Sequence, residues 1–186
     1  IFVHSSIVDE FTDALVEHVN TLVVGNPMDE ATDVSALISL GERDRVEEWV
    51  KEAESQGATI RTGGGTTEDG VLRPTVIADA THDMKVCSLE VFGPVVAIQR
   101  YDDVEDALAM ANDSRYGLQA AIFTANISTA LRAVRALDFG GVLVNEVPTW
   151  RADQQPYGGL RDSGNTREGP AFSVKEMTEI RMVVLS

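Results

Sequence analysis

The sequence is poor in residues that staple, ligate or anchor a protein. It has one cysteine and three histidines among 186 residues, which excludes an internal disulfide framework and leaves no zinc-ligand spacing. No run approaches the ~18 apolar residues of a membrane span, and no signal peptide is visible. A single thiol predicts a reducing, cytoplasmic location.

Basic residues are scarce as well. Fifteen Lys and Arg stand against 30 Asp and Glu, which gives a formal net charge of −15. Because such a surface repels phosphate groups, we expect no nucleic-acid partner and no binding to an anionic membrane. An initial Met is also missing, and "IFVHSSI" begins the chain with an apolar run typical of a strand. We therefore expect the sequence to be a fragment of a longer protein.

Helical periodicity predicts four helices. Ser5 and Ser6 are capping candidates for the first. Ser39 and Glu42 form a capping-box pattern for the second, and Gly57 supplies its stop. The four periodic stretches are residues 7–22, 46–53, 104–111 and 130–137.

Short apolar runs between these helices predict strands. The sequences are "PVVAIQRY", "QAAIFTA" and "GVLVNEV", which are continuous enough to predict burial on both faces. Strands and helices alternate from residue 94 to 145, so the expected fold is a layered α/β domain with a mainly parallel sheet flanked by helices. The tail "EIRMVVLS" predicts a final strand that leaves the compact body.

Cys87 is a candidate nucleophile only if a base, a cation or a helix N-terminus activates it. The nearby acid Glu90 would raise the thiol pKa instead, and we expect a small buried or half-buried side chain. Three glycine-rich stretches match no phosphate-binding fingerprint: "RTGGGTTEDG", "PYGGLRDSG" and "SGNTREGP". The first is expected to be a surface turn. In the other two, the glycines allow close approach either to a ligand or to the chain itself, and the local pattern leaves both open.

The stretch Glu90 to Pro94 is a candidate cofactor contact. On extended backbone, Glu90 and Phe92 would point the same way before a rigid Gly-Pro loop. A carboxylate accepts paired hydroxyl hydrogen bonds, as from a ribose, and an aromatic ring supports a flat heterocycle. An ordinary strand entrance is the alternative.

Several motifs occur in order along the whole chain, including "VVGNPMDEATDVSALIS", "LEVFGPVVAI", "ANDSRYGLQAAIFTANISTALRAV", "GGVLVNEV" and "QPYGGLRDSGNTREG". Together they resemble the aldehyde dehydrogenase superfamily from Ile1 to Leu185. The resemblance implies part of a catalytic domain over residues 1–177, with a C-terminal oligomerisation strand over residues 178–186. It also implies that the nucleophilic cysteine loop lies just upstream of Ile1 and that Cys87 is not the nucleophile.

The resemblance assigns functional residues as well. Glu90 matches the family glutamate that binds the nicotinamide ribose, and Phe92 matches the aromatic residue beside it. Many members have a second acid where this chain has Leu89. Trp150, Arg151 and Tyr157 correspond to the substrate site, where Arg151 would bind an anionic group; a surface ion pair with Asp153 or another acid is the alternative. No catalytic residue and no metal ligand are assigned within the chain.

The expected function is thus that of the catalytic-domain portion of an aldehyde dehydrogenase that uses NAD or NADP. It would oxidise a small-molecule aldehyde to a carboxylic acid through a cysteine thioester, and the fragment alone would be inactive. Two alternatives remain open: a semialdehyde dehydrogenase that acylates coenzyme A, and a non-catalytic α/β interaction module. The apolar tail predicts a homodimer or homotetramer.

Overall fold

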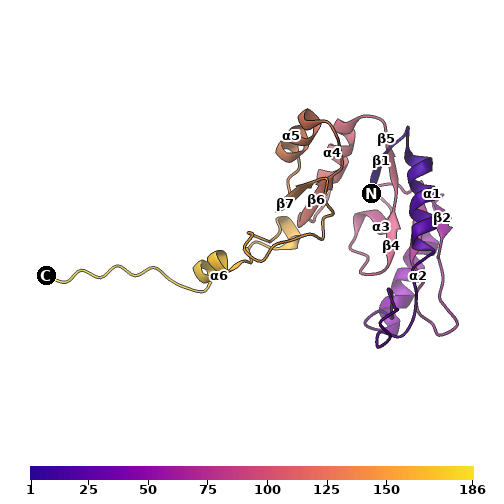
Figure 1. Cartoon of the computed structure of the whole chain (residues 1–186), viewed down its shortest axis with the longest axis horizontal. Coiled ribbons are helices and arrows are strands. Elements are labelled where there is room, and N and C mark those ends of the chain that lie inside the picture. The colour runs from indigo at the N-terminus through magenta and orange to yellow at the C-terminus, as the bar shows by residue number, and fades with distance from the viewer. The chain divides into compact units, whose positions relative to one another are not determined.

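A computed structural model describes residues 1–186, which divide into two compact units, Ile1–Ala107 and Leu108–Ser186 (Figure 1). The elements of the first unit are β1 (Phe2–His4), α1 (Val8–Val19), α2 (Leu40–Ser55), β2 (Thr59–Thr62), β3 (Thr75–Ala78), α3 (Lys85–Ser88), β4 (Val95–Ala97) and β5 (Gln99–Tyr101). After α4 (Val104–Asn112), which crosses the boundary, follow β6 (Gln119–Ile122), α5 (Ile127–Ala136), β7 (Gly141–Val144), the 3₁₀ turn η1 (Arg161–Ser163) and α6 (Pro170–Glu176).

The first unit is built around β3, all four residues of which are buried. β3 pairs in parallel with β4 and antiparallel with β2, and β1 pairs in parallel with β5. Val76 packs in a cluster with Val8 of α1, whereas Ile77 packs with Val50 and Ala53 of α2. Because successive strand residues point to opposite faces, α1 and α2 cover opposite faces of β3. The layered α/β fold predicted from the sequence is confirmed.

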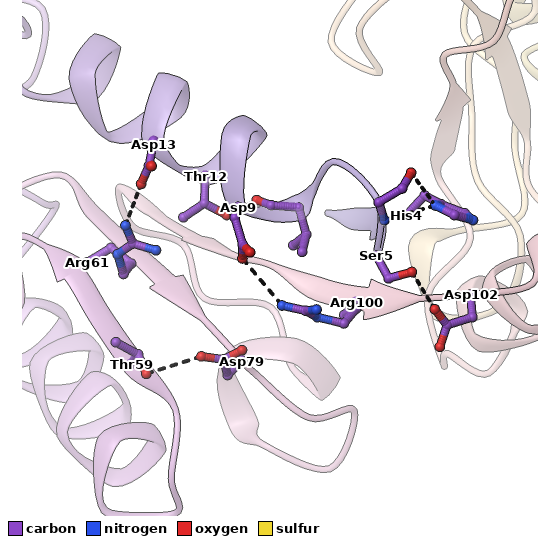
Figure 2. A network of polar contacts seen from close by, with 12 residues as sticks. His4, Ser5, Asp9, Thr12, Asp13, Thr59, Arg61, Asp79, Arg100 and Asp102 are labelled. Atoms are coloured by element: carbon purple, nitrogen blue, oxygen red, sulfur yellow. Dashed lines mark hydrogen bonds and ion pairs between the residues drawn. The ribbon is translucent and has the colours of Figure 1, made fainter.

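Polar contacts tie α1 to two strands, as Figure 2 shows. The Asp13 carboxylate accepts a hydrogen bond from Arg61 Nη2 on β2 at 2.6 Å, and Asp9 accepts one from Arg100 Nη2 on β5 at 3.4 Å. These pairs are largely exposed, so each contributes at most about 1 kcal/mol. The buried apolar cluster therefore supplies most of the stability of α1, and the ion pairs favour one orientation.

The second unit contains two parallel strands joined by a crossover connection that includes a helix. β6 pairs in parallel with β7, from Gln119 opposite Gly141 to Ile122 opposite Val144. The connection runs through α5, which begins where the Asn126 side chain accepts hydrogen bonds from the backbone of the first turn. Parallel neighbours need such a crossover, and the alternation predicted for residues 94–145 is confirmed.

Three local predictions need correction or qualification. Ser39 caps α2 as expected, through a hydrogen bond from Glu42 N of 3.2 Å, but neither Ser5 nor Ser6 caps α1. Ser5 Oγ instead donates to Asp102, and Ser6 Oγ bonds His4 Nδ1 at 2.8 Å. The strands β4, β6 and β7 are only half-buried, rather than buried on both faces. Their side chains are apolar enough for burial on both faces, but the rest of the chain covers these strands incompletely.

The tail after α6 is the third of these predictions, and it needs qualification. Residues 178–186 form neither helix nor strand, because a strand requires a hydrogen-bonded neighbour and these residues have none. Their apolar side chains are exposed, with Ile180 fully so and Leu185 at 92%. The boundary between residues 1–177 and 178–186 stays a prediction. No helix of the chain is both long enough and apolar enough to cross a membrane.

Candidate functional site

The loop between α3 and β4 carries both predicted cofactor contacts. Glu90 is exposed, and its carboxylate has no hydrogen bond or ion pair within the chain. The Phe92 ring is 73% exposed although it is a large apolar group. An unpaired carboxylate and a free aromatic face two residues apart fit the hydroxyls and the flat ring of a dinucleotide.

The backbone of this loop differs from the prediction. Phe92 has φ = +51°, in the left-handed region, so the stretch is not uniformly extended as we expected. Positive φ is a genuine outlier for a bulky residue and costs on the order of 1–3 kcal/mol. Such conformations persist only where surrounding contacts impose them, and they cluster at ligand sites.

Contacts from α2 impose the conformation of this loop. Arg45 Nη2 donates to the Val91 carbonyl at 2.8 Å. A Cβ atom at Gly93 would lie 3.1 Å from a methyl group of the buried Val46, so the loop packs closely on the helix there. Neither contact was predictable from the sequence, because Arg45 and Val91 lie 46 positions apart along the chain.

Cys87 is the half-buried residue that we expected, on the short helix α3. Burial raises the pKa of its thiol, while a hydrogen bond with Gln99 opposes the shift. The carboxylate that adds to the rise is Asp83 rather than Glu90, which corrects the cause given from the sequence. A thiol with a raised pKa is a poor nucleophile near neutral pH.

The predicted substrate residues lie on the segment after β7, in the second unit. Asn145, with φ = +56°, fixes the start of this segment: Thr124 N donates to its Oδ1 at 2.8 Å, and its Nδ2 donates to the Thr124 carbonyl at 3.0 Å. These two hydrogen bonds were not predicted from the sequence, although asparagine tolerates the left-handed conformation better than most residues.

Trp150 lines an open pocket of about 600 Å³. Tyr157 lies beside it, at a smaller hollow of about 50 Å³ that shares part of the same wall. Arg151 contributes to neither. The other residues that line the larger pocket are Gln119, Gly140, Gly141, Val142, Leu143, Val144, Glu146, Gln155 and Pro156.

Arg151 is engaged by its own chain. Its Nη1 lies 3.1 Å from Glu168 Oε2, and its guanidinium stacks over the Tyr157 ring at 4.8 Å from the centroid. Tyr157 and Glu168 are joined in turn by two backbone hydrogen bonds of 2.6 and 3.3 Å. The surface ion pair that the sequence left open is therefore present, with Glu168 rather than Asp153. A substrate anion would have to displace Glu168.

The geometry answers the question that the sequence left open about the glycines. A Cβ at Gly158 would lie 2.2 Å from the Thr166 carbonyl, and one at Gly159 would lie 2.4 Å from Ser163 Cβ. These glycines thus allow close approach of the chain to itself.

No group of three or more His, Cys, Asp or Glu side chains lies close enough together to hold a metal ion.

The two sets of predicted site residues belong to different units. Glu90 and Phe92 lie in the first unit, and Trp150, Arg151 and Tyr157 in the second. Glu90 and Phe92 share one loop, and in the second unit Arg151 contacts Tyr157. Their assignments to cofactor and substrate stay predictions.

Comparison with known proteins gives one family. The sequence profile described as the aldehyde dehydrogenase family matches residues 1–183. A 3-sulfolactaldehyde dehydrogenase from Priestia aryabhattai is 48% identical over 187 residues, which cover 100% of this chain and 39% of that protein. The chain therefore spans about two-fifths of the length of this relative.

Solved structures agree with the sequence comparison. A glyceraldehyde-3-phosphate dehydrogenase from Methanocaldococcus jannaschii, complexed with NADP, matches with a TM-score of 0.92 and 38% identity, over 97% of this chain and 39% of that one. A betaine aldehyde dehydrogenase from Staphylococcus aureus, in complex with NAD⁺, matches with a TM-score of 0.88 and 35% identity, over 95% and 36% of the two chains.

Proposed function

The chain belongs to the aldehyde dehydrogenase family, and from that premise we propose that the protein containing it oxidises an aldehyde to a carboxylic acid with NAD or NADP. The reaction consumes the aldehyde, water and the oxidised cofactor, and yields the acid, the reduced cofactor and a proton. When bound, the cofactor supplies the hydride acceptor. The chain itself contributes the surfaces that hold cofactor and substrate.

The observation that carries this proposal is the loop with Glu90 and Phe92. Its carboxylate is unpaired and exposed, and its ring is exposed on a strained backbone. Glu90 would accept hydrogen bonds from the two hydroxyls of the nicotinamide ribose, and Phe92 would contact the same end of the cofactor. Two similar structures hold NADP or NAD⁺, which supports a dinucleotide as the ligand.

The nucleophile of the proposed reaction lies outside these 186 residues. Cys87 is the only cysteine, and burial raises the pKa of its thiol. A thiolate elsewhere in the full-length protein would attack the aldehyde carbon, and the thioester formed after hydride loss would be hydrolysed.

We also place the protein in the cytoplasm, because a single cysteine suits a reducing compartment.

Trp150, Arg151 and Tyr157 would shape the site of a small aldehyde. Trp150 offers an apolar wall to the pocket, and Tyr157 closes the adjoining hollow. Two of the three similar proteins described above are named for 3-sulfolactaldehyde and glyceraldehyde 3-phosphate, which are both anionic 2-hydroxyaldehydes. Arg151 is the cation in this segment that could bind such an anion, in exchange for Glu168.

The tail would complete the assembly of the protein. Residues 178–186 expose Ile180, Met182 and Val184 together with Val183 and Leu185, so both faces of an extended tail are apolar. Such a segment is stabilised when it pairs with another strand. We assign it as the oligomerisation strand that follows the catalytic domain of residues 1–177, in a homodimer or homotetramer.

The test uses the full-length protein with a panel of aldehydes. We expect NADH or NADPH to form with an anionic 2-hydroxyaldehyde, and mass spectrometry to identify a free carboxylic acid as the product. A second series contains coenzyme A. An acyl-coenzyme A product would transfer the protein to the acylating class, and no reduced cofactor with any aldehyde would favour the non-catalytic module.

A further inference from the structure

We propose that Arg45 is a positioning residue for the cofactor, because it fixes the peptide bond between Val91 and Phe92. The proposal rests on the proposed function, in which Glu90 and Phe92 contact that cofactor. Arg45 lies on α2 and reaches the loop with a single hydrogen bond, from Nη2 to the Val91 carbonyl, of 2.8 Å. It acts on the cofactor site through the backbone of the loop.

The Arg45 guanidinium is itself held on several sides. Its Nε and Nη2 donate to Glu42 Oε2 at 2.9 and 2.7 Å, and the group lies over the Trp49 ring at 4.4 Å from the centroid. Only 28% of the side chain is exposed. Nη2 carries two hydrogens, so it can serve Glu42 and the Val91 carbonyl at the same time. A lysine ammonium lacks the planar fork that makes this arrangement rigid.

The bonded carbonyl controls the strained residue directly. The Val91 carbonyl and the Phe92 nitrogen belong to one planar peptide unit, and φ of Phe92 is the rotation about the bond from that nitrogen to the Phe92 Cα. A hydrogen bond that fixes the plane therefore opposes relaxation of φ from +51° to the negative values that phenylalanine prefers. Without it, the peptide can turn and carry the ring away.

α2 fixes the loop on the other side of Phe92 as well. Gly93 packs against Val46, the residue next to Arg45, and Val46 is fully buried. The loop is thus attached to the helix at Val91 and at Gly93, one residue before and one after the strained position. The exposed ring of Phe92 and the exposed carboxylate of Glu90 are presented from a backbone that is already set. Such preorganisation lowers the cost of binding.

The test measures cofactor binding by full-length Arg45→Lys and Arg45→Gln variants. We expect calorimetric Kd and steady-state KM for the preferred cofactor to rise by about tenfold, the loss of roughly one charge-assisted hydrogen bond. The aldehyde KM should stay within about twofold, because the substrate residues lie on another segment. Arg43→Lys is the matched control on the same helix, since Arg43 pairs with Asp44 and contacts Gly70 instead of the cofactor loop.

Two further variants separate this inference from the proposed function. If Glu90→Gln and Phe92→Ala both leave cofactor affinity unchanged, the assignment of the loop itself is wrong. If those variants weaken binding and folded Arg45→Lys does not, the positioning role is refuted. The double variant Arg45→Lys/Phe92→Ala should weaken binding by less than the product of the single effects, because both act on one peptide. Multiplicative effects would show that Arg45 acts independently of Phe92, against the proposal.

Discussion

Gly140 and Gly141 are adjacent in sequence, but the structure predicts opposite outcomes for the same substitution. A Cβ atom at Gly140 would lie 1.7 Å from the Gly158 carbonyl oxygen and 2.8 Å from its carbon. A Cβ at Gly141 would meet only side-chain atoms of Gln119, at 3.3 to 3.5 Å, and that flexible side chain can move. Gly140→Ala should therefore be severe and Gly141→Ala mild.

The magnitude follows from what has to move. The Gly158 backbone must retreat by more than about 1 Å, and this movement strains the junction at Gly117, whose carbonyl accepts hydrogen bonds from both Gly140 N and Leu160 N at 3.0 Å. Overpacking of a well-packed site costs about 1–3 kcal/mol, and a clash between two backbones belongs at the upper end. About 3 kcal/mol lowers the midpoint of thermal unfolding by roughly 6–12 °C for a cooperative unit of 150–250 residues, and by less for a larger one.

Thermal unfolding of the two full-length variants, followed by calorimetry, measures the difference. Gly141→Ala should remain within about 1 kcal/mol of the parent and so within a few degrees. Limited proteolysis gives a second measure, because a displaced segment around Gly158 should be cut faster in Gly140→Ala alone. Equal midpoints for the two variants would refute the close approach of Gly140 to Gly158.

Four other predictions concern the thiol, the isolated chain and the tail. Burial raises the pKa of the Cys87 thiol, so the contribution of the protonated thiol to protein stability is complete below the ordinary thiol pKa and is lost as pH rises through the pKa of the folded state. Alkylation of Cys87 in the native protein should therefore have a higher pH midpoint than alkylation of a free cysteine. A midpoint at or below that of free cysteine would contradict the burial argument. Cys87→Ser should change turnover of the full-length enzyme by less than about twofold, whereas a loss of a thousandfold would make Cys87 the nucleophile. The purified 186-residue chain should form no NADH or NADPH from any aldehyde, and measurable turnover would place the nucleophile within it. Deletion of residues 178–186 should lower the oligomeric mass in light scattering, and an unchanged mass would remove the tail from the subunit contact.

The four helices with a clear apolar period were predictable from the sequence because their signals are local, whereas the short helices α3 and α6 were missed. Ser39 and Gly57 lie at the two ends of α2, where a hydroxyl cap and a left-handed glycine are expected, and both take those roles. Strand β3 was missed, since four residues between Pro74 and Asp79 are too few to establish a period. It is nevertheless the most buried strand, because helices from two distant parts of the chain cover its two faces.

The candidate site was predictable in residue type but not in geometry. Glu90 and Phe92 were found from their chemistry and their motif. The left-handed φ of Phe92 has no sequence signal, because the signal for that conformation is glycine or asparagine. Arg45 carries no signal either: on the sequence it is one charged residue of an amphipathic helix. Its effect on the loop depends on a contact that only the folded chain creates.

The tail shows where sequence and single-chain structure diverge for a physical reason. Residues 180–185 are apolar on both faces, the pattern of a strand covered on two sides, yet they lie exposed and without secondary structure. A strand is stabilised by hydrogen bonds to a neighbour, so one segment alone cannot hold the conformation that its side chains favour. The pattern is therefore the basis of the proposed subunit contact. For the tail, the sequence therefore predicts the assembled state, in which a second strand is available.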